Sequence, residues 1–167
     1  MAGMKTLFLV RHAKSSWSTP GMRDFDRPLN ERGMNDAPKM ASFLQKSGMT
    51  PDLLVSSPAK RALTTARFFA AVFRINESDI VLKPDIYEAD PTDVLRIISE
   101  LPETCSKAMI FGHNPTFTDI ANRFSEDIIE NVPTCGVVCI KSRAEKWNEL
   151  FEGNSRIAAS WFPKEVL

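Results

Sequence analysis

The fold is decided by residues 7–15, which read Leu7-Phe8-Leu9-Val10-Arg11-His12-Ala13-Lys14-Ser15. A short apolar run stops abruptly at Arg11 and His12, a pattern typical of a buried strand that ends in cationic side chains. The chain has only two histidines, and His113 follows a second apolar run at residues 108–112. Both histidines are therefore expected at the ends of strands, where fixed guanidinium and imidazole groups suit the binding of anions.

Strand-like and helix-like segments alternate along the rest of the chain. Apolar runs predict strands, and helical periodicity between them predicts helices. The expected strands are 5–10, 52–56, 80–83, 108–111, 137–141 and about 157–162, and the expected helices are 30–48, 57–73, 90–101 and 114–124. This alternation predicts an α/β three-layer sandwich with a mostly parallel central sheet.

Local signals indicate where the helices begin and which faces they bury. Asn30, Ser57 and Asp90 are the expected N-caps, because each precedes a helical pattern and has a short side chain that accepts hydrogen bonds. The periodicity of the first helix predicts an apolar face made of Met34, Ala37, Ala41 and Leu44.

Length and composition limit the classes of protein that fit. The chain has 167 residues, which predicts a single domain over residues 1–167. Its 21 basic and 21 acidic side chains cancel, which argues against a nucleic-acid or membrane-surface binder. No apolar run is long enough for a signal peptide or a bilayer span, so we expect a cytoplasmic protein. Three cysteines without a Cys-x-x-Cys pair indicate neither a disulfide framework nor a zinc site, and the oligomeric state stays open.

The predicted topology brings distant residues together. In open sheets of this type, ligands bind outside the carboxyl ends of the strands. His12 and His113 follow two of the strands, and Arg61 lies in the first turn of the helix after a third. The helices that begin near Ser57 and Asn114 would also direct free backbone N–H groups toward the same crevice. We therefore expect an anion site at this edge of the sheet.

Three short motifs carry a resemblance to a known family. They are Leu9-Val10-Arg11-His12-Ala13, Ser57-Pro58-Ala59-Lys60-Arg61-Ala62 and Gly112-His113-Asn114. In combination they resemble the histidine phosphatase superfamily, also called phosphoglycerate-mutase-like. The most similar branch is that of the small bacterial phosphohistidine phosphatases of the SixA type, and the resemblance spans nearly the whole chain. It implies a minimal phosphoglycerate-mutase-like fold without an inserted lid subdomain.

The resemblance also implies roles for individual residues. The implied catalytic residues are His12 as the phosphorylated nucleophile, Arg11, Arg61 and His113 as the phosphate pocket, and Glu88 as the proton donor. Arg27, in Asp26-Arg27-Pro28-Leu29, matches a further phosphate-contacting arginine of the branch. Ser15 in the first loop and Asn114 beside His113 are also predicted to contact the substrate. Ala13 is a departure, since many members have glycine there, and its methyl group would lie near the phosphate.

Phosphoryl transfer fits these residue types. The moving group spreads negative charge over its equatorial oxygens, so catalysis needs positioned cations, and we expect neither a metal nor a cofactor. His12 must attack as the neutral imidazole, with its other nitrogen donating to a backbone carbonyl. A thiolate phosphatase is excluded, because none of the three cysteines is followed six positions later by arginine. An aspartyl-phosphate enzyme built on Asp24-Phe25-Asp26 is set aside, because no apolar strand precedes that segment.

The substrate class follows from the spacing of the site residues. About fifty residues separate Arg61 from His113, and the expected strand, loop and helix use nearly all of them, which leaves little for a lid. An uncovered pocket fits a bulky phosphoprotein, so the leading hypothesis is hydrolysis of protein phosphohistidine. The alternatives are a phosphatase for a small sugar or nucleotide monophosphate, and a non-catalytic phosphate-binding regulatory module, against which the presence of His12 argues.

Overall fold

A six-stranded sheet lies at the centre of the computed structural model, which describes residues 4–167. Its strands are β1 (Lys5–Arg11), β2 (Leu53–Ser56), β3 (Val81–Leu82), β4 (Lys107–Gly112), β5 (Val137–Ser142) and β6 (Ser155–Trp161). The helices around it are α1 (Glu31–Lys46), α2 (Lys60–Phe73), α3 (Pro91–Ser99), α4 (Thr116–Arg123) and the short α5 (Pro163–Val166). Each expected strand and helix is present, and α5 is an addition. Within residues 4–167, no helix has the length and apolarity that a bilayer crossing requires.

The sheet has the strand order β3-β2-β4-β1-β5-β6. Strands β3, β2, β4 and β1 run parallel to one another, whereas β5 pairs antiparallel with both β1 and β6. The predicted α/β sandwich with a mostly parallel sheet is confirmed. Because β1, β2 and β4 are parallel neighbours, their carboxyl ends lie at one edge of the sheet.

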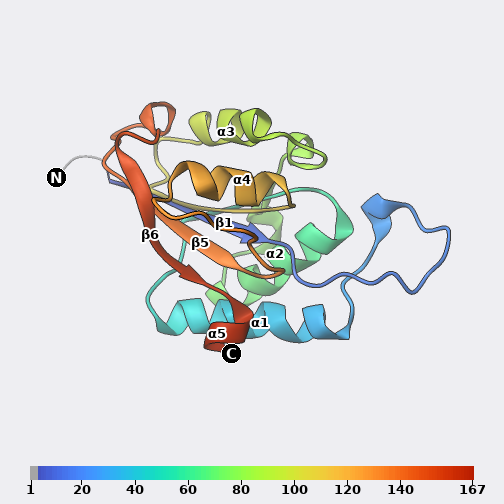
Figure 1. Cartoon of the computed structure of the whole chain (residues 1–167). Coiled ribbons are helices and arrows are strands. Elements are labelled where there is room, and N and C mark those ends of the chain that lie inside the picture. Colours follow the sequence, from blue (N-terminus) through green and yellow to red (C-terminus); the bar gives the residue numbers. More distant parts are fainter. Residues whose placement is uncertain (1–3) are drawn as a thin grey trace.

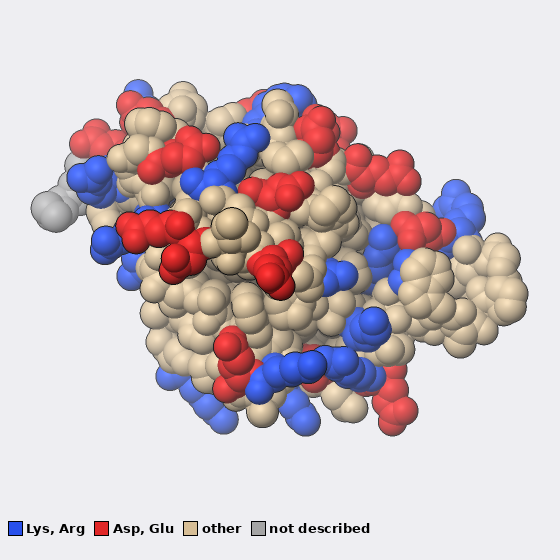
Figure 2. All heavy atoms as spheres, in the orientation of Figure 1, with Lys and Arg blue, Asp and Glu red and all other residues tan. Residues whose placement is uncertain are grey.

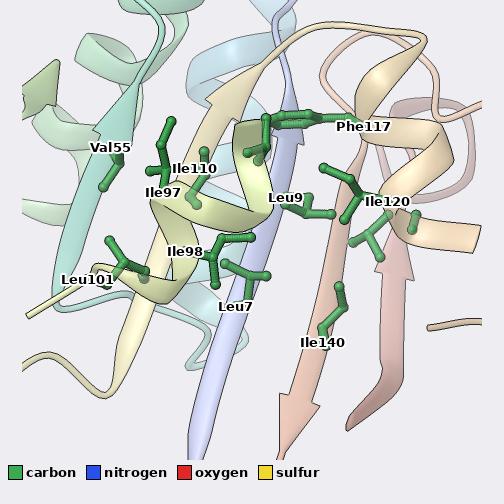
Figure 3. Close-up of a cluster of buried hydrophobic side chains, with 14 of the residues drawn as sticks. Leu7, Leu9, Val55, Ile97, Ile98, Leu101, Ile110, Phe117, Ile120 and Ile140 are labelled. Carbon is green, nitrogen blue, oxygen red and sulfur yellow. The ribbon is translucent and has the colours of Figure 1, made fainter. Parts of the chain in front are cut away.

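Helices cover both faces of the sheet, with α3 and α4 on one side and α1, α2 and α5 on the other (Figure 1). Leu7 and Leu9 of β1 belong to the apolar cluster that packs against α3 and α4 (Figure 3). Phe8 and Val10 belong to the cluster on the opposite face. Since β1 is buried on both faces, its sequence is continuously apolar instead of alternating.

Helix α1 lies close to the segment that follows β1. Its buried residues are Gly33, Ala37, Met40, Ala41 and Leu44. The prediction of Met34 on this face is wrong, because its side chain is 47% exposed. Gly33 takes that place, since a Cβ there would lie 2.2 Å from the carbonyl oxygen of Lys14. The predicted N-cap is confirmed, because the Asn30 side chain accepts from the backbone N–H of Gly33.

Replacing Gly33 by alanine is expected to lower the free energy of unfolding by about 2–3 kcal/mol. Alanine favours a helix by about 1 kcal/mol over glycine, so a net loss would report the collision with the backbone of Lys14. Denaturant titration measures the change, and Met34→Ala at the next, exposed position should shift stability by less than about 0.5 kcal/mol. A Gly33→Ala protein as stable as the wild type would contradict this account of the packing.

The predicted helix starts have different outcomes. Asp90 is the N-cap of α3 and closes a capping box, as expected. The prediction of Ser57 as the N-cap of α2 is wrong, because α2 begins at Lys60 after Ala59, whose side chain makes no capping hydrogen bond. Helix α4 also begins later than expected, at Thr116. In both places the residues directly after the strand lie outside the helix, at the carboxyl edge of the parallel strands.

Candidate active site

The ends of β1, β2 and β4 bring the two histidines together. Arg11 at the end of β1 pairs with Gly112 at the end of β4, and the backbone N–H of His12 donates to the Gly112 carbonyl at 3.0 Å. Ser57 directly follows β2 and donates its backbone N–H to the carbonyl of Phe111 at 3.0 Å. The centroids of the His12 and His113 rings lie 5.3 Å apart. Residues more than a hundred positions apart therefore meet because parallel strands end at the same edge.

His12 is buried and held in one orientation. Its Nδ1 lies 2.7 Å from the backbone carbonyl oxygen of Ala13. A carbonyl oxygen only accepts, so Nδ1 carries the proton and Nε2 keeps its lone pair. Burial is the main reason why the pKa of His12 is lowered to about 3. The hydrogen bond to Ala13 acts to raise the pKa, and His113 and Arg61 lower it further. At neutral pH the ring is an uncharged nucleophile whose lone pair is at Nε2.

His113 is fixed by a partner that follows β2. Its Nε2 lies 2.8 Å from the Ser57 hydroxyl. Burial lowers its pKa to about 4, with a further lowering by Arg61. Within residues 4–167, two buried side-chain nitrogens have no hydrogen-bond partner, His113 Nδ1 and Arg11 Nε. Both site residues therefore retain unused hydrogen-bonding capacity. Leaving a buried polar group unsatisfied in this way costs about 1–3 kcal/mol.

The depressed pKa values predict how stability depends on pH. Unfolded histidine titrates near 6.5, whereas the folded rings of His12 and His113 titrate near 3 and 4. Below pH 6.5 the unfolded chain binds protons that the folded chain does not, so the free energy of unfolding falls as pH is lowered from 7 to 5. The slope approaches about 1.4 kcal/mol per pH unit for each ring. Urea unfolding at both pH values measures it, and a His12→Asn/His113→Asn protein with the wild-type slope would contradict the assignment.

Asp24 joins three segments beside the histidines. Arg61 lies in the first turn of α2, as predicted, and is 7% exposed. Its Nη1 donates to the Asp24 carbonyl oxygen at 2.7 Å and its Nη2 to the Asp24 carboxylate at 3.0 Å. Arg27 Nη1 and the Tyr87 hydroxyl donate to the same carboxylate at 2.9 and 2.8 Å. Burial acts to raise the pKa of Asp24, but the hydrogen bonds from Tyr87 and Arg61 lower it to about 2, so the carboxylate is ionised.

Tyr87 forms one wall of the site. Its ring centroid lies 5.7 Å from that of His113 and 5.1 Å from that of Phe25, both in edge-on contact. Burial and then the Asp24 carboxylate raise its pKa to about 12. Sequence reasoning did not identify Tyr87, Asp24 or the Ser57 hydroxyl as parts of this site. Position is the signal that could have found Ser57, because it follows β2 as His12 follows β1.

Arg27 and Ser15 organise the first loop. Arg27 Nε donates to the backbone carbonyl of Ser16 at 3.2 Å, and its Nη2 donates to the Ser15 hydroxyl. With Nη1 on Asp24, all three guanidinium nitrogens of Arg27 bond to loop groups. Both residues are buried beside the pocket, with Ser15 bridged to Leu29. The structure therefore gives Arg27 a direct role in holding the loop, while phosphate contact stays a prediction.

Asn114 and Arg11 share a backbone acceptor. Arg11 Nη1 and Asn114 Nδ2 each donate to the carbonyl oxygen of Val132, both at 3.0 Å. The Asn114 side-chain oxygen accepts from both the backbone N–H and the hydroxyl of Thr118 at the start of α4. Asn114 thus connects α4 with the segment that holds Arg11. Its predicted substrate contact stays a prediction.

Glu88 lies in the loop after β3, directly after Tyr87. Its side chain is exposed, and its backbone has a φ of 55°, in the left-handed region. In the described part of the chain, its side chain makes neither a hydrogen bond nor an ion pair. The neighbouring Tyr87 contacts His113, and the charge of Glu88 helps to raise the pKa of Tyr87, so the role of Glu88 as proton donor stays a prediction. The Ala13 methyl group, which departs from the family pattern, packs in the cluster with Phe8 and Val10.

The assembled groups suit the transfer of an anion. Arg11 and Arg61 are permanent cations whose planar guanidinium groups donate several hydrogen bonds. The two imidazoles are neutral at neutral pH. Across residues 4–167, no group of three or more His, Cys, Asp or Glu side chains lies together as a metal-binding cluster. A neutral nucleophile beside fixed guanidinium groups is the arrangement that phosphoryl transfer needs.

Comparison with known proteins gives a consistent assignment. The model of the histidine phosphatase superfamily (branch 1) matches residues 7–119. An uncharacterised chloroplastic protein of Arabidopsis thaliana is 32% identical over 88% of this chain and 71% of its own length. The structure of a protein from Agrobacterium tumefaciens, assigned as the phosphohistidine phosphatase SixA, is 30% identical with a TM-score of 0.79, covering 94% of this chain and 97% of that one. A protein histidine phosphatase SixA complexed with tungstate has the same fold, with 18% identity and a TM-score of 0.81 over 97% of this chain and 99% of that one. The chain is a phosphatase that belongs to the histidine phosphatase superfamily (branch 1) and has the fold of its SixA-type members.

Proposed function

We propose that this phosphatase removes phosphoryl groups from protein phosphohistidine, without a metal ion, through a phosphorylated His12. His12 Nε2 attacks phosphorus as the P–N bond to the substrate imidazole breaks, and the departing ring takes its proton from solvent. Arg11, Arg61 and His113 bind the equatorial oxygens on which charge develops. Water then attacks phosphorus, the P–N bond to His12 breaks, and inorganic phosphate leaves.

The observation that carries this proposal is the protonation state of the groups around the two histidines. An alkoxide leaving group needs a proton donor whose pKa lies near the working pH. Asp24 is ionised, with its pKa lowered to about 2, and Tyr87 holds its proton, with its pKa raised to about 12. Glu88 is exposed, and among the described residues its side chain makes no hydrogen bond or ion pair with these groups. Because neither Asp24 nor Tyr87 is matched as an acid, these contacts favour a substrate whose leaving group departs readily, and a phosphorylated imidazole is such a substrate.

The openness of the site supports a bulky substrate. Between Arg61 and His113 the chain forms α2, β3, α3 and β4 with short turns between them. None of these elements is an inserted subdomain, and α3 packs on the sheet together with α4 (Figure 1). A phosphorylated side chain on the surface of a protein can reach such a site.

A comparison of substrates tests the proposal. Purified enzyme would be assayed for phosphate release from a histidine-phosphorylated protein, from free phosphohistidine, and from alkyl phosphates such as glucose 6-phosphate and adenosine monophosphate. We expect kcat/KM for the phosphohistidine substrates to exceed that for the alkyl phosphates by at least about 100-fold, the range ascribed to general acid catalysis. A higher kcat/KM for an alkyl phosphate would overturn the proposal.

A further inference from the structure

The loop between β1 and α1 projects from the body of the molecule beside the site. It is the blue loop at the right of Figure 1. Residues 16–22, here called the arm, read Ser16-Trp17-Ser18-Thr19-Pro20-Gly21-Met22 and carry no charge, although a quarter of the chain is charged. All but Ser16 are exposed. The same projection is largely free of charged atoms in Figure 2.

The base of the arm is fixed by hydrogen bonds. Ser16 donates its backbone N–H to Pro28 at 2.8 Å, and Asn30 donates to the carbonyl of Lys14 at 2.9 Å. Ser15 bridges Leu29 in antiparallel fashion. These contacts close the loop on both sides, so the arm has a defined direction where it leaves the body.

Trp17 is the notable residue of the arm. Its side chain is 75% exposed, the largest exposed fraction of any aromatic residue among those described. Its ring lies over the Arg27 guanidinium, with 3.3 Å between Cζ and the ring centroid. Arg27 is 8% exposed and is itself held by Ser15, Ser16 and Asp24. An indole that is both exposed and held in place loses little conformational freedom when it binds a partner.

Trp17 is connected to the pocket by direct contacts. Its ring contacts Arg27, Arg27 donates to the Asp24 carboxylate, and Arg61 donates to the same carboxylate. The indole therefore lies outside the pocket and close to its rim. The protein surface around a phosphorylated side chain offers the indole a larger area to contact than a small phosphate compound does.

We propose that Trp17 is a specificity-determining residue that contacts the protein carrying the phosphohistidine. The inference rests on the proposed function and adds a partner surface to it. The contact is apolar, because the arm has no charge with which to select a charged partner. Tryptophan is also one of the residue types enriched among those that dominate binding at protein interfaces.

The test compares two substrates that share the scissile bond. One is a protein phosphorylated on histidine with phosphoramidate, and the other is free phosphohistidine. Trp17→Ala is expected to lower kcat/KM for the protein by about tenfold, mainly through KM, because it removes binding present in ground and transition states alike. It should leave kcat/KM for free phosphohistidine within about twofold, and Trp17→Phe should lie between wild type and Trp17→Ala.

Phe151→Ala is the matched control. Phe151 is also an exposed aromatic residue, at 56%, but it precedes β6, whose start pairs through β5 with the start of β1, at the edge of the sheet opposite to the site. Its replacement should change neither rate. Wild-type kinetics of Trp17→Ala on the protein substrate, or equal losses on both substrates, would overturn the inference alone. Failure of the wild type to hydrolyse either phosphohistidine substrate would overturn the proposed function and this inference with it.

Discussion

His12→Ala is expected to abolish turnover, with kcat reduced by at least about 10³-fold, because removal of a nucleophile leaves only the binding groups to act on the substrate. The Nδ1 hydrogen bond to Ala13 and the depressed pKa leave His12 with a free lone pair at Nε2. Phosphate release from phosphohistidine measures the rate. Rapid acid-free quenching with ³²P-labelled substrate should trap label on the wild-type enzyme and none on the variant.

A second variant separates chemistry from folding. His12→Asn keeps a side-chain N–H that can donate to the Ala13 carbonyl, so the local fold is preserved, and the nucleophilic nitrogen is lost. It should be as inactive as His12→Ala and should unfold at a similar denaturant concentration to the wild type. His113→Asn retains the nucleophile and should still trap label, at a lower rate of turnover. Unchanged hydrolysis by either His12 variant would refute the assignment of the nucleophile.

The strands and their meeting edge could be predicted because burial on two faces leaves a direct record in the sequence. Residues 7–10 and 108–111 are continuously apolar, and the carboxyl ends of parallel strands lie at the same edge of the sheet. His12 and His113 therefore converge by topology, without any knowledge of side-chain contacts. The hydrogen bond from His12 to a backbone carbonyl was also expected, because a neutral nucleophile requires a fixed tautomer.

The remaining parts of the site depend on contacts that periodicity does not encode. Ser57 has the composition of an N-cap, but its hydroxyl contacts His113 and the helix starts at Lys60. Gly33 replaces Met34 on the buried face of α1, because close approach of two backbones selects the smallest residue even though it adds no apolar surface. Asp24 lies in an irregular loop, and only the folded chain brings its carboxylate to Arg61.

Arg61→Ala is expected to lower kcat/KM by about 10²–10³-fold, the range observed when one preorganised donor to a developing anion is removed. The replacement removes one cation and leaves the ionised Asp24 carboxylate, still held by Arg27 and Tyr87, beside the histidines. Arg67→Ala is the control on the same helix, because Arg67 is half exposed and paired with Glu77. It should change kcat/KM by less than about twofold.

The double variant Arg61→Ala/Asp24→Asn distinguishes loss of the donor from exposure of the carboxylate. If Asp24 without Arg61 repels the phosphoryl group, neutralising it should recover about tenfold of the activity lost in Arg61→Ala, a coupling of about 1.4 kcal/mol. If the lost donor accounts for the whole effect, the double variant will be no faster than Arg61→Ala. A kcat/KM of Arg61→Ala within twofold of the wild-type value would exclude Arg61 from the phosphate pocket. The contact between Arg61 and Asp24 would then be purely structural.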